Sequence, residues 1–323
     1  QGMTLKTRQD TPQFRVYAKA IMSAIAAKTT SRAEYDDSIA RMDEPFLSRG
    51  YNGVSNDFYL GMRRQGMRKD EIVSSRFDFD GSQDYDLGLT NAIQGRSRGI
   101  FPPSEYTKHY FKPFAEGIKK SLFDNFYSTA VDLNFISVKV HLLSLLSAKA
   151  NLFNDDEEYI CFYDLSAMDT TTHRGFMNSY HQFCEGLFPD FEKVEGDTFA
   201  SCRLYFPSVI GSKQYLVQEI NGRSTLSGQP DVTTKNNICH ILAMSWCLGK
   251  TFDVSPEDAF THLMTGKGSL NGQQIVAHIH GDDTMIYMGD DKSKYDVYYG
   301  YLSELGFGVS FEKAPIFLKK TSL

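Results

Sequence analysis

The sequence has little cysteine, no repeated unit and no long apolar stretch. Its five cysteines, among 323 residues, show no C-x-x-C spacing, so a disulfide framework or a zinc ribbon is not expected and a reducing compartment is. No apolar run reaches the roughly 18 residues that a membrane span requires. Residues 1–19 are polar, unlike a signal peptide, and because the first residue is not Met we expect an excised piece of a longer chain.

The composition is otherwise that of a globular protein. Hydrophobic residues make up 41% and charged residues 23%, so a chain of this length can bury a sizeable core. The net charge of −6 is unevenly divided. Residues 1–150 carry 21 Lys and Arg against 17 Asp and Glu, whereas residues 151–323 carry 13 against 23. The difference in charge would be explained if the first half binds an anion and the second half binds cations. An accident of surface composition would explain it equally well.

Hydrophobic periodicity predicts helices in the first third of the chain and a mixture of helices and strands later. The expected helices cover residues 14–27, 121–150 and 233–248. The expected strands cover residues 158–163, 215–220, 274–279 and 284–288. Residues 70–103, punctuated by glycine, predict loops or short strands. The last two strands flank a tight Gly-Asp-Asp turn, which indicates a β-hairpin and favours an α+β fold over a doubly wound parallel sheet.

Acidic residues stand at two of these strand ends. Asp164 follows the apolar run 158–163, and Asp282 and Asp283 lie at the tip of the predicted hairpin. Carboxylates from separate segments can converge on Mg²⁺, which binds carboxylate oxygens together with substrate phosphates. A Gly-Asp-Asp tripeptide by itself is more often a solvated turn, so the interpretation depends on the order and spacing of several motifs.

That order resembles the palm of viral RNA-directed RNA polymerases. The pattern D-x(4)-D at 164–169, S-G…T-x(3)-N at 227–237 and G-D-D at 281–283 resembles motifs A, B and C. Three further stretches resemble motif F (96–102), motif D (305–313) and motif E (316–319). The narrower resemblance is to the enzymes of small double-stranded RNA viruses of picobirnavirus or partitivirus type.

The resemblance implies an α+β, right-hand polymerase with an RRM-like antiparallel palm sheet plus fingers. Residues 1–155 are expected to form fingers, with the fingertip motif F near 94–103. Residues 156–323 are expected to form the palm, with a fingers-type insertion near 175–220. Because the chain stops just after the motif E stretch, the thumb is expected to be absent from it.

The resemblance also assigns roles to single residues. Asp164, Asp282 and Asp283 match the metal-holding carboxylates, which take Mg²⁺ with Mn²⁺ as a substitute. Lys313 matches the lysine proposed to protonate the leaving pyrophosphate, with Lys319 or Lys320 as alternatives.

A second group of matches concerns the ribose of the incoming nucleotide. Asp169 and Asn237 match the pair that recognises the 2′-hydroxyl, and a dNTP would leave that pair without its partner. Ser227 and Gly228 match the flexible motif B loop, and Thr233 its threonine. A register one residue shorter would instead assign Val232 and Asn236, so the motif B alignment stays open.

Two arginines match the nucleotide entry path. Arg96 and Arg98 alternate along an expected strand and so face one side, where guanidinium groups suit triphosphate oxygens. Arginine in a loop is more often simply solvated, so this assignment depends on the other motifs.

The resemblance implies an RNA-directed RNA polymerase that transfers NMP from NTP to an RNA 3′-hydroxyl in viral genome replication and transcription. Its expected partners are template RNA, nascent RNA, NTPs and a viral capsid protein, with no membrane segment in the chain. The expected location is the host cytoplasm or the virion. Alternatives are a reverse transcriptase, a non-catalytic RNA-binding fragment and a two-metal phosphoesterase. A reverse transcriptase would favour a bulky aromatic beside Asp169, and Met168 and Thr170 flank it instead.

Overall fold

The computed structural model describes residues 11–28, 72–74, 76–78, 98–100, 118, 161–166, 168–172, 174–187, 202–207, 215–220, 231–289 and 291–311. The chain divides into two compact units, here called the sheet unit and the second unit. The sheet unit comprises Gln1–Thr29, Ile118–Gly186 and Thr233–Leu323, and the second unit comprises Thr30–Gly117 and Leu187–Val232. The assignment of residues 1–155 to fingers and 156–323 to palm stays a prediction.

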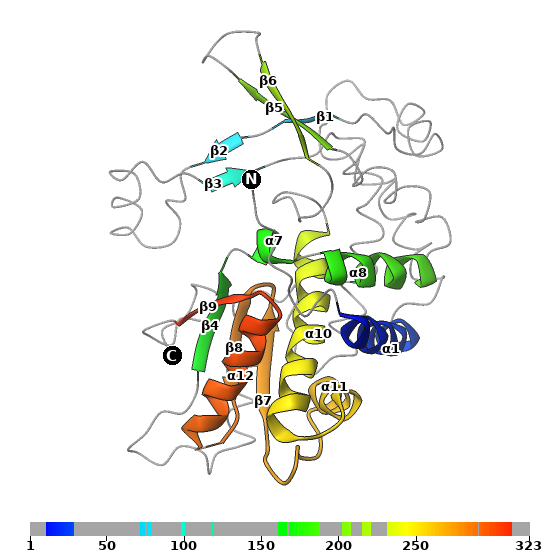
Figure 1. Cartoon of the computed structure of the whole chain (residues 1–323), viewed down its shortest axis with the longest axis vertical. Coiled ribbons are helices and arrows are strands. Elements are labelled where there is room, and N and C mark those ends of the chain that lie inside the picture. Colours follow the sequence, from blue (N-terminus) through cyan, green and yellow to red (C-terminus); the bar gives the residue numbers. More distant parts are fainter. Residues whose placement is uncertain are drawn as a thin grey trace, which may run out of the picture. The chain divides into compact units, whose positions relative to one another are not determined.

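A four-stranded antiparallel sheet forms the centre of the sheet unit (Figure 1). Its strands, in spatial order, are β7 (Val276–His280), β8 (Asp283–Tyr287), β4 (Cys161–Ser166) and β9 (Gly308–Phe311). Along the chain they alternate with helices in the β-α-β-β-α-β arrangement of ferredoxin-like folds. The hairpin predicted around the Gly-Asp-Asp turn is confirmed, because β7 pairs with β8.

Among the described residues of the sheet unit, five helices connect these strands. Between β4 and β7 lie α7 (Met168–Thr171), α8 (Arg174–Leu187), α10 (Val232–Phe252) and α11 (Pro256–Thr265), and α12 (Lys292–Glu304) joins β8 to β9. Helix α10 is buried at 18 of its 21 positions, as expected of a helix enclosed on every side. The helix predicted at 233–248 is therefore confirmed and extends four residues further.

Local sequence explains where α11 begins and ends and where α12 begins. The Ser255 side chain accepts a hydrogen bond from the Asp258 amide at 3.0 Å, and Pro256 occupies the first helical turn. Gly266 ends α11 in the left-handed conformation with φ 64°, which costs glycine little. Asp291 caps α12 in the same way, because its side chain accepts from the Ser293 amide at 3.0 Å.

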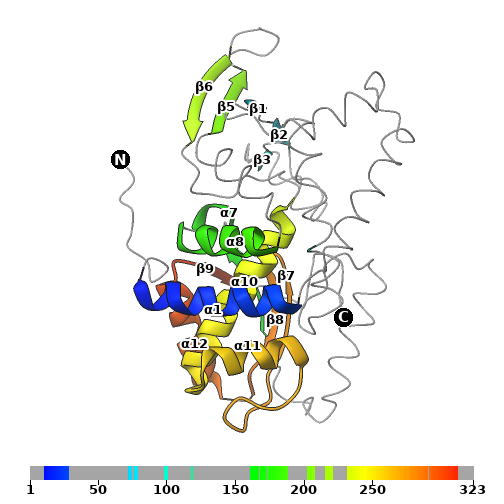
Figure 2. The ribbon, with the colours of Figure 1, turned by 90° about the vertical axis from the view of Figure 1, so that its right-hand side faces the viewer.

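The N-terminal helix α1 (Pro12–Lys28) belongs to the sheet unit and confirms the helix predicted at 14–27. It begins where the Thr11 hydroxyl accepts from the Phe14 amide at 3.3 Å. The Phe14 ring lies 4.9 Å from Phe176 of α8 and 5.6 Å from Trp246 of α10. Figures 1 and 2 show α1 lying across α10, so residues near the start of the chain pack against a helix that lies more than 200 residues later.

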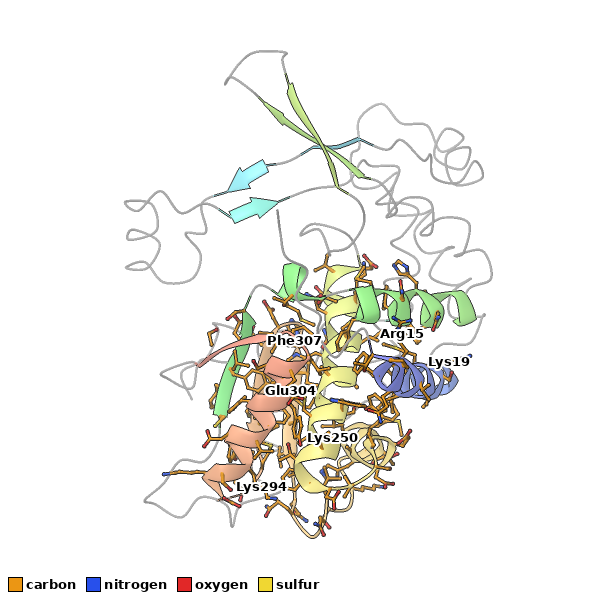
Figure 3. The ribbon with its side chains drawn as sticks, viewed as in Figure 1. Arg15, Lys19, Lys250, Lys294, Glu304 and Phe307 are labelled. Carbon is orange, nitrogen blue, oxygen red and sulfur yellow. The ribbon has the colours of Figure 1, made fainter. Side chains whose placement is uncertain are left out.

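The turn between α12 and β9 is anchored by an aromatic side chain. Phe307, labelled in Figure 3, is 2% exposed, and its ring stands edge-on to Phe176 at 5.4 Å. Because Phe176 also contacts Phe14, one aromatic cluster joins α1, α8 and the start of β9. This contact fixes the position of β9 beside β4.

In the part of the second unit that the structure describes there are two small sheets. One has the order β1 (Ile72–Ser74), β5 (Cys202–Pro207), β6 (Tyr215–Ile220), with β1 parallel to β5 and β5 antiparallel to β6. The other pairs β2 (Arg76–Asp78) with β3 (Arg98–Ile100) antiparallel. The strand at 215–220 and short strands within 70–103 are confirmed, and the helix predicted at 121–150 lies outside the described residues. The mixture of helices and mostly antiparallel sheets confirms the α+β class.

Candidate functional site

Asp164 lies inside strand β4, between two neighbouring strands. It pairs with Asp283 of β8 on one side and with Ser310 of β9 on the other. The sequence predicts that the strand ends before Asp164, and this is wrong, because β4 continues to Ser166. The reason is β9, whose pairing with β4 from Tyr163 to Ser166 extends the strand by contacts that span nearly 150 residues of sequence.

Alternation along β4 separates a buried face of the sheet from a partly exposed one. Tyr163 and Leu165 are buried, whereas Asp164 and Ser166 are partly exposed. Residues directly opposite on antiparallel strands share a face with Cβ atoms roughly 4.5–5.5 Å apart, so Asp283 lies beside Asp164 on the partly exposed face. Ser310 lies on its other side, with its Oγ 3.4 Å from Asp164 Oδ2.

Asp282 reaches the same place through the hairpin turn. Gly281 and Asp282 are the two turn residues between His280 and Asp283, and Gly281 has φ 68° whereas Asp282 lies outside the positive-φ region. Glycine at the first central position is typical of a type II′ turn, the form that suits the twist of a hairpin. The Leu165 amide donates to the Asp282 carbonyl at 3.1 Å, which attaches the turn to β4 directly after Asp164.

The donor set at this edge suits a hard divalent cation. Asp164, Asp282 and Asp283 are all partly exposed, and like charges directly opposite on neighbouring strands repel each other. Among the described residues, no group of three His, Cys, Asp or Glu side chains is placed to hold an ion alone. Mg²⁺ usually binds through one or two carboxylates and completes its shell with water and substrate phosphates, so Asp164 and Asp282 fit it.

A histidine that the sequence analysis missed lies beneath the turn. His240 of α10 is fully buried, and its Nδ1 donates to the Gly281 carbonyl at 2.9 Å. Its Nε2 lies 3.2 Å from the Tyr163 hydroxyl and 3.1 Å from the Thr284 hydroxyl. Burial lowers the pKa of His240 to about 4, although the Gly281 hydrogen bond and the charge of Asp282 act in the opposite direction. The ring is therefore neutral at pH 7, with its proton on Nδ1 and an acceptor at Nε2.

The network continues to α12. The Tyr163 and Tyr298 hydroxyls are 2.7 Å apart, and burial raises the pKa of both phenols, so both stay neutral. Tyr163 therefore joins strand β4 to both α10 and α12. Nothing in the sequence marks His240, because a histidine within an apolar helix is ordinarily a core residue.

The predicted ribose-selecting residues lie on two helices of the sheet unit. Asn237 is fully buried in α10, and its Nδ2 donates to the Thr233 carbonyl at 2.8 Å. Thr233 is partly exposed one turn earlier. Asp169 lies in α7, directly after β4. The alternative pair, Val232 and Asn236, occupies the same first turns of α10, so the motif B register stays open.

The structure brings the backbones of Asp164, Asp282 and Asp283 onto neighbouring positions, and the roles of all the predicted site residues stay predictions. Arg98 begins β3 in the second unit. Arg96, Ser227, Gly228 and Lys313 lie outside the described residues. In the part of the chain that the structure describes, no helix combines the length and the apolar character needed to cross a membrane.

Comparison with known proteins identifies the fold. No protein family matches the chain at the level of sequence, and no curated protein matches it either. Among solved structures, the chain is similar to the RNA-dependent RNA polymerase from bacteriophage phi12, with a TM-score of 0.57 and 13% identity. The likeness covers 95% of this chain and 54% of that one, so the chain spans about half the length of the phage enzyme. At this identity the likeness shows a shared fold, the viral RNA polymerase fold that the motif order predicts.

Proposed function

We propose that the chain carries the catalytic centre of a viral RNA-directed RNA polymerase. The observation that carries the proposal is the pairing of Asp164 with Asp283 on neighbouring strands, in a chain that has a polymerase fold. The Asp282 carbonyl is bonded to the residue that follows Asp164. In this proposal the four-stranded sheet is the palm, and the second unit contributes fingers. The narrower placement among picobirnavirus- or partitivirus-like enzymes is part of the proposal.

The reaction joins an RNA 3′-hydroxyl to the α-phosphate of an NTP and releases pyrophosphate. Asp164 and Asp282 would hold Mg²⁺ or Mn²⁺, and Asp283 would assist from the adjoining position. Bound cations lower the pKa of the attacking hydroxyl and neutralise charge on the leaving group. By holding the cation, the chain's own carboxylates would determine where the triphosphate binds.

Recognition of the nucleotide would fall to polar groups around this centre. Asp169 and Asn237 would select ribose through the 2′-hydroxyl, and Thr233, Ser227 and Gly228 would flank the nascent base pair. Arg96 and Arg98 would line the path of the triphosphate, and Lys313 would protonate pyrophosphate. Template sequence would be selected by base pairing, while the protein contacts backbone and 2′-hydroxyls.

The proposal brings partners and a location with it. Template RNA, nascent RNA and NTPs are the expected ligands, and a viral capsid protein is an expected partner. The expected location is the host cytoplasm or the interior of the virion.

The test is nucleotide incorporation on a primed homopolymeric RNA, with Mg²⁺ or Mn²⁺, comparing NTP with dNTP. We expect ribonucleotide incorporation by the wild-type chain and none by Asp282→Ala, with RNA binding nearly unchanged in both. Asp296→Ala is the matched control, because it removes the same charge from an exposed position on α12.

Each alternative function has its own outcome in this assay. Preference for dNTP would indicate a reverse transcriptase. RNA binding without incorporation would indicate a non-catalytic RNA-binding protein. Metal-dependent release of nucleotides from the primer would indicate a phosphoesterase. Full activity in Asp282→Ala would refute the metal assignment.

A further inference from the structure

Three residues that adjoin the three aspartates meet at one imidazole. Tyr163 precedes Asp164, Gly281 precedes Asp282, and Thr284 follows Asp283. Their polar atoms lie 3.2, 2.9 and 3.1 Å from ring nitrogens of His240. Since side chains alternate along a strand, Tyr163 and Thr284 face α10 while the carboxylates of Asp164 and Asp283 face the opposite side of the sheet.

The contact with Gly281 acts on the tight turn of the hairpin. The Gly281 carbonyl belongs to the central peptide of the turn, and rotation of that peptide would convert a type II′ turn into type I′. The rotation would give Asp282 a positive φ and would redirect its side chain. The hydrogen bond from Nδ1 opposes this rotation, because it requires the carbonyl to point toward α10.

The remaining contacts orient the ring itself. In the neutral ring Nε2 has no proton, so it accepts from the Tyr163 or the Thr284 hydroxyl. The Tyr163 hydroxyl is in turn 2.7 Å from that of Tyr298. The His240 side chain therefore joins strand β4, strand β8 and the turn to α10, and Tyr163 extends the network to α12. Such support determines how precisely ligands converge on a metal.

We propose that His240 is the positioning residue of the catalytic centre, and that its Nδ1 contact with Gly281 holds Asp282 in the orientation that binds a divalent cation together with Asp164. This inference rests on the proposed function. His240 lies on the far side of the sheet from the carboxylates, so it acts on the ion and on substrate only through the residues that it holds.

Two conservative variants separate the contacts of the ring. In His240→Asn the side-chain amide can take the position of Nδ1 and donate to Gly281. In His240→Gln the amide reaches the position of Nε2 and loses the Gly281 contact. His240→Phe keeps the planar shape and removes every hydrogen bond. Thr251→Ala is the control on the same helix, because Thr251 is buried and, among the described contacts, its hydroxyl donates only to the Cys247 carbonyl.

Three measurements distinguish a positioning role of His240 from a general loss of stability. Mn²⁺ affinity is measured on the full 323-residue chain by electron paramagnetic resonance of free Mn²⁺, with no nucleotide present. Exchange of the Leu165 amide, which donates to Asp282, is measured by hydrogen exchange without metal. kcat and KM for NTP come from primed incorporation.

We expect His240→Gln and His240→Phe to lower Mn²⁺ affinity and kcat each about 10- to 100-fold, with KM for NTP nearly unchanged. They should also speed exchange at Leu165. His240→Asn should remain within about threefold of wild type in both quantities, since it keeps the donor. Thr251→Ala should lower the unfolding midpoint without changing Mn²⁺ affinity.

Other outcomes overturn the inference. If His240→Asn and His240→Gln lose similar amounts of Mn²⁺ affinity, and the losses follow the decrease in their unfolding midpoints, His240 only packs the core. If a His240 variant does not fold, Tyr163→Phe combined with Thr284→Val removes, at nearly constant shape, both donors that orient the ring toward Gly281. Unchanged Mn²⁺ affinity and unchanged Leu165 exchange in that variant refute the inference that the oriented ring holds the turn. A wild-type chain that binds Mn²⁺ but incorporates no nucleotide would refute the proposed function, while the His240 comparison would still be decided by affinity and exchange.

Discussion

Lowering the pH should destabilise the sheet unit through His240. Burial lowers the pKa of this histidine from 6.5 to about 4 in the folded chain. The unfolded chain therefore binds a proton at a pH where the folded chain does not. His240 contributes stability fully above pH 6.5, and that contribution is lost as the pH falls toward 4.

The size of the effect follows from the shift. A difference of about 2.5 pKa units corresponds to about 3 kcal/mol of unfolding free energy between pH 7.5 and pH 4. About 2 kcal/mol of it should already be lost at pH 5, where the unfolded histidine is almost fully protonated. Carboxylates titrate in the same range, so wild type must be compared with His240→Gln, which has no proton to bind at this position.

The assay is urea unfolding without divalent metal at several pH values, followed by the fluorescence of Trp246. This is the sole tryptophan of the chain, it is 5% exposed, and its ring packs against Phe14 and Tyr17. Its emission therefore reports separation of α1 from α10. We expect the stability difference between wild type and His240→Gln to shrink by about 3 kcal/mol between pH 7.5 and pH 4. A difference independent of pH would refute the reasoning.

Three further predictions concern single positions. In Gly249→Ala the new Cβ would lie 3.0 Å from the Pro256 Cα. The cost of overpacking, about 1–3 kcal/mol, should exceed the gain in helix propensity of about 0.5–1 kcal/mol, so the urea midpoint should fall, and a raised midpoint would contradict this. Gly281→Ala meets open space but keeps φ 68°, so unfolding free energy should fall by about 1–2 kcal/mol, whereas an unchanged midpoint would mean that the turn changes type. Asn237→Ala or Asp169→Ala should reduce discrimination between NTP and dNTP in the incorporation assay, and an unchanged ratio would refute ribose selection by that residue.

Local patterns made several elements predictable. The apolar run of α10, the apolar residues on either side of the Gly-Asp-Asp turn and the pattern of α1 each lie within one segment of the sequence, and all three elements form. Glycine before Asp282 likewise predicts a tight turn, because only glycine takes a positive φ there without strain.

Tertiary contacts decided what these patterns could not. Strand β4 extends beyond Asp164 because β9 arrives beside it from far along the chain, and no local signal records that pairing. Helix α1 joins the unit of the sheet through rings at positions 14, 176 and 246, which only the folded chain brings together.

The sequence by itself determined which carboxylates to consider and in what order they occur, because motif spacing is a property of the chain. It could not show that the neighbours of all three aspartates meet at His240, since that convergence requires β4, the hairpin and α10 to pack in one arrangement. Directional hydrogen bonds between distant segments form only after that packing is complete, and so the support beneath the site is visible only in the tertiary structure.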